Sequence, residues 1–316
     1  MTMKTAGIHH ITAFVTDAQR NVDFYAGVLG LRLVKKTINF DAPEVYHLYF
    51  GNESGSPGTA ITFFPWAGGR KGKIGGGQVG VTVYAVPVGS FEFWQDRLNR
   101  LGIASTRTER FGESFIRFAD WDGLAIELVE RELGTPSRWS FGGVPADMAI
   151  KGFGGAVLNS FAPERTMHVL ESVMGLEREG REGELVRFRA SGELGNVIDV
   201  NHTPMGWGIG GAGTVHHIAW RAKDEAEHRS WREHIVRSGF EPTPVIDRQY
   251  FNAIYFREEG GILFEIASDT PGFAHDEPFE TLGEKLMLPH WLEDRRDEVA
   301  QGLPPIQVRE LEGDTQ

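Results

Sequence analysis

Apolar residues recur at helical spacing in four stretches of the chain, and a glycine follows each stretch. The four stretches are Asp17–Leu29, Ser90–Leu101, Pro163–Met174 and Asp224–Ser238. The glycines that follow them are Gly30, Gly102, Gly175 and Gly239. Because glycine readily adopts the left-handed conformation in which many helices end, this pattern predicts four helices that stop at these glycines.

Each predicted helix is preceded by one short β-type run and followed by several more, which are separated by turns rich in glycine. The first and third units are alike in the phrases GVLGLRLV and SVMGLERE, and the second and fourth in GLAIELVE and GILFEIAS. The helix stops lie about 70 residues apart, which is too long for a solenoid repeat. The sequence therefore predicts an α+β fold made of four βαβββ modules.

Grouping the modules in pairs predicts two barrel-like domains. An N-terminal domain would span residues 1–135 and a C-terminal domain residues 151–268, with two modules in each. Residues 136–150 would form the linker, since glycine, proline and serine are frequent around them. Residues 269–316 would form a C-terminal tail, with a helix over Trp291–Gln301.

Composition narrows the class of protein. The 316 residues include 32 basic and 44 acidic side chains, and the resulting charge of −12 argues against nucleic acid as a partner. The chain has no cysteine, which excludes disulfides, thiolate metal sites and cysteine nucleophiles and fits a cytoplasmic location. No signal peptide pattern is visible and no apolar run approaches the roughly 18 residues of a membrane span, so a membrane is not expected as a partner.

Two histidine doublets open strand-like runs at equivalent places in modules one and four. His9-His10 begins IHHITAFV, and His216-His217 begins VHHIAWRA. Side chains alternate between the two faces of a strand, so one histidine of each doublet should face a common site. A single histidine in a strand is more often a hydrogen-bonded structural residue, but two doublets at matching repeat positions favour a metal site.

Glu265 would supply the third metal ligand, beside His10 and His217. It lies between Phe264 and Ile266 in an apolar run, where a carboxylate is unfavourable unless it is paired or bound to a metal. Two imidazoles and one carboxylate form the facial triad of non-haem Fe(II) sites, and Mn(II) accepts the same ligands. The alternative for Glu265 is a buried ion pair with an arginine.

The remaining modules lack the histidines. Module two has Gly80-Val81 and module three has Gly154-Gly155 where the doublets stand in modules four and one. Module two nevertheless has Glu127 at the position that corresponds to Glu265. We therefore expect one metal site per chain, formed by modules one and four, and a metal-free second barrel formed by modules two and three.

Other motifs carry less information. Gly75, Gly77 and Gly80 match G-x-G-x-x-G, but a dinucleotide-binding motif should open a helix, whereas the following VGVTVYAV is typical of a strand. The other histidines are scattered and are expected to be structural or exposed. They are His47, His168, His202, His228, His234, His275 and His290.

Several segments together resemble the vicinal oxygen chelate superfamily, which includes glyoxalases and extradiol dioxygenases. They are GIHHITAFVTDAQRNVDFYAGVLGLRLVKKT, YHLYFGNESGSPGTAITFFP, FGESFIRFADWDGLAIELVE and DRQYFNAIYFREEGGILFE. Within the superfamily the chain is most similar to hydroquinone-type ring-cleaving dioxygenases. The resemblance implies a metal on His10, His217 and Glu265, with a hydroquinone-like aromatic compound and O₂ as substrates.

The resemblance also implies five residues around the metal, which are His9, Thr12, His216, Arg248 and Tyr255. Arg248 could stabilise a phenolate or an oxyanion, and Tyr255 and His216 could donate a hydrogen bond or a proton during oxygen chemistry. Strict strand alternation would turn His9 and His216 away from the metal. Their participation therefore requires a twisted or irregular start to each strand.

Two other functions remain open. A glyoxalase-type isomerase or lyase would want a second carboxylate ligand, which the corresponding TAITFFP run of module one does not contain. A resistance protein that binds an aromatic or quinone compound without turnover would not need the metal triad. The ring substituents, which could be chlorine or alkyl groups, are not specified, and a homo-oligomer is compatible with the sequence.

Overall fold

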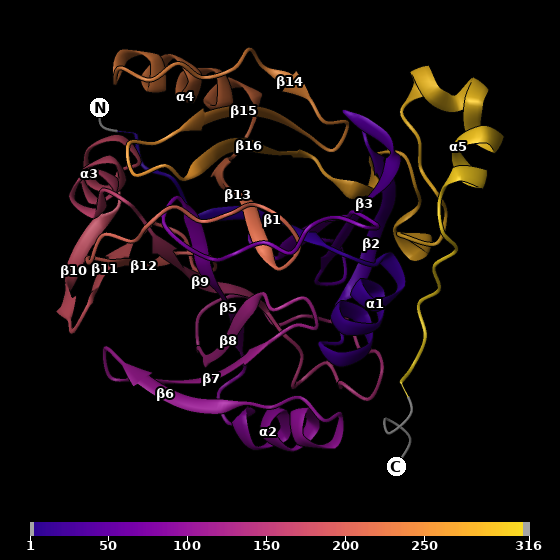
Figure 1. Ribbon diagram of the computed structural model, residues 1–316, viewed down its shortest axis with the longest axis horizontal. Helices are drawn as coiled ribbons and strands as arrows, with labels where there is room; N and C mark the ends of the chain where they lie inside the picture. The colour runs from indigo at the N-terminus through magenta and orange to yellow at the C-terminus, as the bar shows by residue number, and fades with distance from the viewer. Residues whose placement is uncertain (1–2, 312–316) are drawn as a thin grey trace.

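The computed structural model describes residues 3–311, whose strands form two eight-stranded sheets (Figure 1). The first sheet contains β1 (Ile8–Val15), β2 (Arg32–Asn39), β3 (Ala42–Gly51), β4 (Ala60–Pro65), β13 (Thr214–Ala222), β14 (Ile246–Asp247), β15 (Phe251–Arg257) and β16 (Leu263–Pro271). The second contains β5 (Gln78–Val86), β6 (Thr106–Arg110), β7 (Glu113–Ala119), β8 (Ala125–Glu130), β9 (Gly152–Asn159), β10 (Glu177–Glu182), β11 (Leu185–Arg189) and β12 (Val197–Asn201). The predicted α+β fold of four modules in two barrel-like sheets is confirmed.

Each sheet joins two modules through a central antiparallel pair of strands. Strand β1 pairs with β13, which unites modules one and four, and β5 pairs with β9, which unites modules two and three. The proposed division between residues 1–135 and 151–268 thus runs through both sheets, between β1 and β13 in the first and between β5 and β9 in the second. It describes the order of modules along the chain, whereas the sheets combine modules from both halves.

The helices occupy the four predicted stretches. They are α1 (Ala18–Val22) with a π-helix over Asp23–Val28, α2 (Phe91–Arg100), α3 (Pro163–His168) with a π-helix over Val169–Val173, and α4 (Glu225–Arg237). All four glycine stops have positive φ, between 68° and 89°. The two π-helices, which the sequence did not predict, each run into the start of one of the related phrases of modules one and three. No helix within residues 3–311 has the length and apolar character needed to cross a membrane.

The C-terminal tail returns to module one and runs beside β2, β3 and α1 (Figure 1). As far as residue 311, the tail contains three 3₁₀ turns and one short helix. They are Phe273–His275, Phe279–Thr281, His290–Arg295 and α5 (Arg296–Gly302). The last two elements lie where the sequence predicted a helix. The tail thus covers the edge strand β2, which would otherwise expose unpaired backbone groups.

Deleting residues 304–316 is expected to lower the free energy of unfolding by about 1–3 kcal/mol, mainly through lost apolar contacts. Ile306 and Leu311 pack against the hydrophobic core, whereas the ion pair between Arg309 and Asp23 (2.7 Å) is partly exposed and contributes little. Urea denaturation of the full and shortened chains measures the difference. An unchanged midpoint and slope would show that the tail does not stabilise the fold.

Candidate metal centre

Three side chains from three strands of the first sheet converge on one point. Nε2 of His10 lies 3.2 Å from Nε2 of His217, and Oε2 of Glu265 lies 2.9 Å from His217 and 3.3 Å from His10. All three side chains are buried, and their ligand atoms lie within 4.8 Å of one another. The fold therefore brings together the three residues that the sequence suggested as ligands.

Glu265 is a buried carboxylate whose contacts are the imidazoles of His10 and His217, with no arginine or lysine paired to it among the described residues. Neither of its oxygens has a hydrogen bond of normal geometry in the described part of the chain. Burial raises the pKa of the Glu265 carboxyl, but His10 and His217 outweigh burial and hold this pKa well below its usual range. Burial also lowers the pKa of His217, which favours the neutral imidazole that binds metals. The donor set fits a divalent cation.

The first histidine of each doublet also remains beside the site, because both strands bulge there. The pairing of β1 with β13 skips His9 in one strand and His216 in the other. Nδ1 of His9 lies 3.0 Å from Nδ1 of His10, and Nδ1 of His216 lies 2.8 Å from Nδ1 of His217. A bulge re-aims a side chain that strict alternation would turn away. His9 and His216 can therefore orient the rings of the two candidate ligands.

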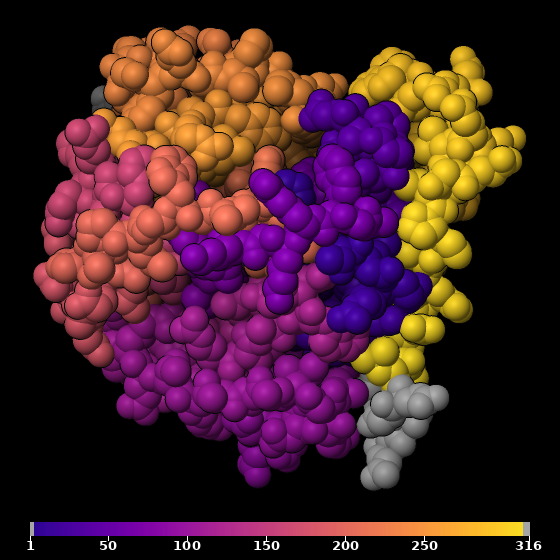
Figure 2. All heavy atoms as spheres, in the orientation of Figure 1, coloured from indigo at the N-terminus to yellow at the C-terminus, as the bar shows by residue number. Residues whose placement is uncertain are grey.

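A cavity of about 390 Å³ opens beside the three residues, between modules one and four. Figure 2 shows the surface hollowed between the violet β2–β3 hairpin and the orange strands of module four. Its lining is largely aromatic with a few polar groups. The lining residues are His10, Phe14, Asn39, Phe40, Asp41, Ala42, His47, Tyr49, Phe64, Trp66, His216, His217, Arg248, Phe251, Tyr255 and Leu263. Its size and character suit a small aromatic molecule.

Tyr255 and Arg248 form a polar wall of this cavity. Tyr255 is the cross-strand partner of Glu265, and its hydroxyl accepts a hydrogen bond from Nε of Arg248 (3.2 Å). Burial and then Glu265 raise the pKa of Tyr255, while Arg248 opposes the rise. The phenol is therefore protonated at neutral pH and can donate a hydrogen bond. Nη1 of Arg248 also pairs with Asp41 at 3.1 Å.

Thr12 lies behind the cavity wall in a chain of hydrogen bonds that reaches His47. The hydroxyls of Thr12 and Thr62 are 2.7 Å apart, and Nε2 of His47 is 2.9 Å from the hydroxyl of Thr62. Nδ1 of His47 is 2.8 Å from the hydroxyl of Tyr49. His47, which was expected to be structural or exposed like the other scattered histidines, lines the cavity. His47 and Tyr49 are two residues apart in the strand-like run YHLYF, so their side chains were expected to share one face of a strand, which could have identified His47 as a lining residue.

A family model described as the Glyoxalase/Bleomycin resistance protein/Dioxygenase superfamily matches residues 7–128 and 153–266. The chain belongs to this superfamily. Residues 7–128 contain modules one and two, and residues 153–266 contain modules three and four. The linker and the tail lie outside the match.

Among the superfamily's proteins, the chain is similar to MhqO of Bacillus subtilis (strain 168), named as a candidate ring-cleaving dioxygenase. The identity is 61% over 312 residues, which cover 99% of this chain and 100% of MhqO. It is also 36% identical over 309 residues to the chlorohydroquinone/hydroquinone 1,2-dioxygenase of Sphingobium indicum, covering 94% and 95% of the two chains. A crystal structure of a candidate dioxygenase from Bacillus subtilis superposes with a TM-score of 0.97 at 61% identity, covering 98% and 100%.

The second sheet of this superfamily member repeats the backbone of the site with different chemistry. Glu127 stands opposite Val83 of β5 as Glu265 stands opposite Ala219 of β13. Nη2 of Arg110 donates a hydrogen bond to Glu127 at 2.7 Å, and the space around them is filled. Glu127 thus forms the buried ion pair with an arginine that was the alternative expectation for Glu265.

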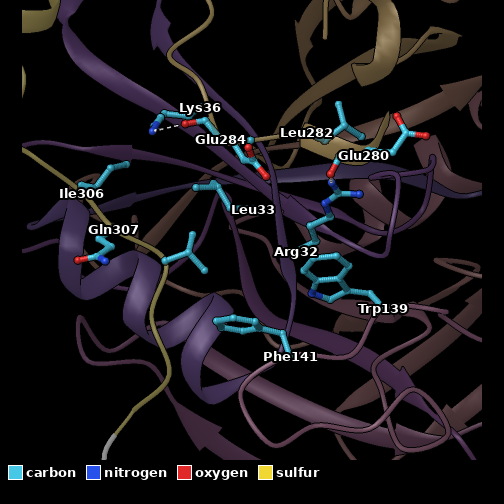
Figure 3. A pocket seen from close by; sticks show the side chains of 12 residues that line it. Arg32, Leu33, Lys36, Trp139, Phe141, Glu280, Leu282, Glu284, Ile306 and Gln307 are labelled. Carbon is cyan, nitrogen blue, oxygen red and sulfur yellow. Dashed lines mark hydrogen bonds between the residues drawn. The ribbon is translucent and has the colours of Figure 1, made fainter. Parts of the chain in front are cut away.

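Another cavity, of about 380 Å³, lies between β2, the linker and the tail (Figure 3). Arg32 stacks over the ring of Trp139 at 4.7 Å, and Nζ of Lys36 donates a hydrogen bond to the backbone carbonyl of Glu284 at 3.0 Å. Among the described residues, the lining has two cations (Arg32 and Lys36), two acids (Glu280 and Glu284) and no histidine. It therefore belongs to the packing of the tail and lies apart from the candidate metal centre.

Proposed function

We propose that the chain is an Fe(II)-dependent ring-cleaving dioxygenase that inserts O₂ into a hydroquinone-like ring. The observation that carries this proposal is the convergence of His10, His217 and Glu265 beside an aromatic cavity. Such a facial triad leaves coordination positions for small molecules. The names of the relatives, one of them a hydroquinone dioxygenase, support the same chemistry.

The bound metal would bring a substrate phenolate and dioxygen together and allow electrons to pass between them. The protein supplies the surrounding groups. The permanent charge of Arg248 can stabilise negative charge on a substrate oxygen, and the protonated hydroxyl of Tyr255 can donate a hydrogen bond or a proton near Glu265. His9 and His216 hold the ligand rings in place, and the aromatic walls orient the substrate and exclude water.

A glyoxalase-type isomerase is less well supported, because the second carboxylate is missing. Thr62 stands opposite Thr12 in module one as Glu265 stands opposite Ala219 in module four. The hydroxyl of Thr62 is engaged with Thr12 and His47. Binding without turnover would not explain why a buried carboxylate is left without a hydrogen bond between two histidines.

Oxygen uptake after anaerobic reconstitution tests the proposal. Protein loaded with Fe(II), and in parallel with Mn(II), is offered hydroquinone, catechol and a methylglyoxal–thiol adduct. We expect oxygen consumption with hydroquinone and none with the adduct. A preparation with full iron content that consumes no oxygen with any dihydroxybenzene would refute the dioxygenase function.

Tyr255→Phe is expected to lower kcat for oxygen uptake roughly 100-fold or more while the iron content stays at the wild-type level. The substitution removes only the hydroxyl that Arg248 contacts. Tyr46→Phe is the matched control, since the Tyr46 hydroxyl donates to the carbonyl of Pro304 (3.0 Å), outside the cavity. Equal rates in the two variants would exclude a role of the Tyr255 hydroxyl in turnover.

A further inference from the structure

Arg248 of the first sheet has a structural counterpart in the second sheet, Arg110. Each arginine stands at the turn of the hairpin whose second strand pairs with the strand of the central glutamate. Each is followed by a non-glycine residue with positive φ, Phe111 at 51° and Gln249 at 70°. Non-glycine residues rarely adopt this conformation, so the shared feature indicates the same local backbone at both places.

The two arginines nevertheless point to different partners. Arg110 turns inward, where Nη2 donates to Glu127 and Nε to Asp199, both at 2.7 Å, and all three side chains are buried or nearly so. Arg248 turns outward, where Nη1 pairs with Asp41, whose side chain is 75% exposed at the cavity mouth. Glu127 therefore has an arginine as its partner, whereas Glu265 has none within residues 3–311, because Arg248 pairs with Asp41.

The position of a second acid accounts for this difference. Asp199 lies in β12 opposite Val157, and the corresponding residue of the first sheet is Thr62, in β4 opposite Thr12. Thr62 is neutral and bonds to its own neighbours. In the second sheet, the acid paired with Arg110 is therefore the buried Asp199. In the first sheet, the acid paired with Arg248 is Asp41, which lies on the β2–β3 turn at the cavity mouth.

We propose that Asp41 is a positioning residue that holds the Arg248 guanidinium away from Glu265 and so keeps this carboxylate free to bind the metal. The inference rests on the proposed function, since it takes Glu265 as a metal ligand. An arginine at this backbone position can reach the central glutamate, since Nη2 of Arg110 donates to Glu127 at 2.7 Å. Nε of Arg248 already contacts the hydroxyl of Tyr255, the cross-strand partner of Glu265. An arginine bound to Glu265 would neutralise the charge that attracts the cation.

A double-mutant cycle on metal affinity tests this role. The dissociation constant for Mn(II) is measured by competition with a chromophoric chelator for wild type, Asp41→Ala, Arg248→Gln and the double variant. Since one ion pair is partly exposed, we expect Asp41→Ala to weaken binding roughly two- to fivefold. The loss should vanish in the Arg248→Gln background, because no guanidinium remains to compete.

Two further variants serve as controls for the cycle. Asp41→Glu should bind Mn(II) like wild type, and Glu44→Ala, which removes an exposed acid of the same hairpin, should also leave the affinity unchanged. An equal loss in both Arg248 backgrounds would show a general charge effect and overturn the proposal, as would no loss at all. Wild-type protein that binds no divalent metal would instead refute the proposed function itself.

Discussion

Glu265→Ala and His217→Ala are each expected to abolish stoichiometric metal binding while the protein remains folded. Both residues direct their ligand atoms at one point, 2.9 Å from each other, and a facial triad that loses one of three ligands binds its metal far more weakly. The Glu265 side chain is fully buried, and its replacement by alanine removes the charge from the site and leaves no unpaired carboxylate behind. The Glu265→Ala apoprotein should therefore stay folded.

Metal content after anaerobic reconstitution with Fe(II) and desalting measures this effect, with circular dichroism as the test of folding. Glu127→Gln is the matched control, because Glu127 holds the same place in the second sheet but is paired with Arg110. This variant should keep the full iron content. Iron retained by both Glu265→Ala and His217→Ala would mean that the ligand assignment is wrong.

Arg110→Ala is expected to lower the free energy of unfolding by about 3–5 kcal/mol, because it leaves the buried carboxylate of Glu127 with only the half-exposed Arg117 as a partner. Arg110 donates to both Glu127 and Asp199 at 2.7 Å, and Asp199 keeps a second partner in Arg187. The carboxylates of Glu127 and Asp199 would then face each other across the void that the arginine side chain leaves. Urea denaturation at neutral pH measures the loss.

Arg117→Ala is the control for this prediction, since Arg117 contacts the same glutamate from outside. Its Nη1 lies 3.6 Å from Glu127, and its side chain is 48% exposed. A solvent-screened pair of this kind contributes less than about 1 kcal/mol. Similar losses in Arg110→Ala and Arg117→Ala would show that the buried network is not what stabilises the second sheet.

The chain thus uses one backbone arrangement twice. In the second sheet the central glutamate is neutralised by an arginine, and in the first it faces two histidines and a cavity. The fold thus accepts a buried glutamate without a metal, whereas the candidate metal site also requires the two histidines. A buried glutamate at this position is compatible with either role, and the side chains that face it, two histidines in the first sheet and an arginine in the second, decide between them.

The sequence by itself determined the four modules and the three residues of the candidate metal centre. Helical periodicity and the glycine stops are local properties, and the backbone conformation they require does not depend on the rest of the fold. The two histidine doublets could be assigned to one site because they occupy the same place in modules one and four. The resemblance supplied Arg248 and Tyr255, which indeed line the cavity.

The tertiary structure decided the features that depend on how strands pair. The bulges that keep His9 and His216 beside the ligands arise from the register between β1 and β13, which no single segment encodes. The association of module one with module four, and of module two with module three, was expected from the histidine doublets, but the strand pairs β1–β13 and β5–β9 that form it are features of the tertiary structure. The approach of Asp41 to Arg248, 207 residues away in the chain, likewise exists only in the folded molecule, because long-range contacts leave no local pattern.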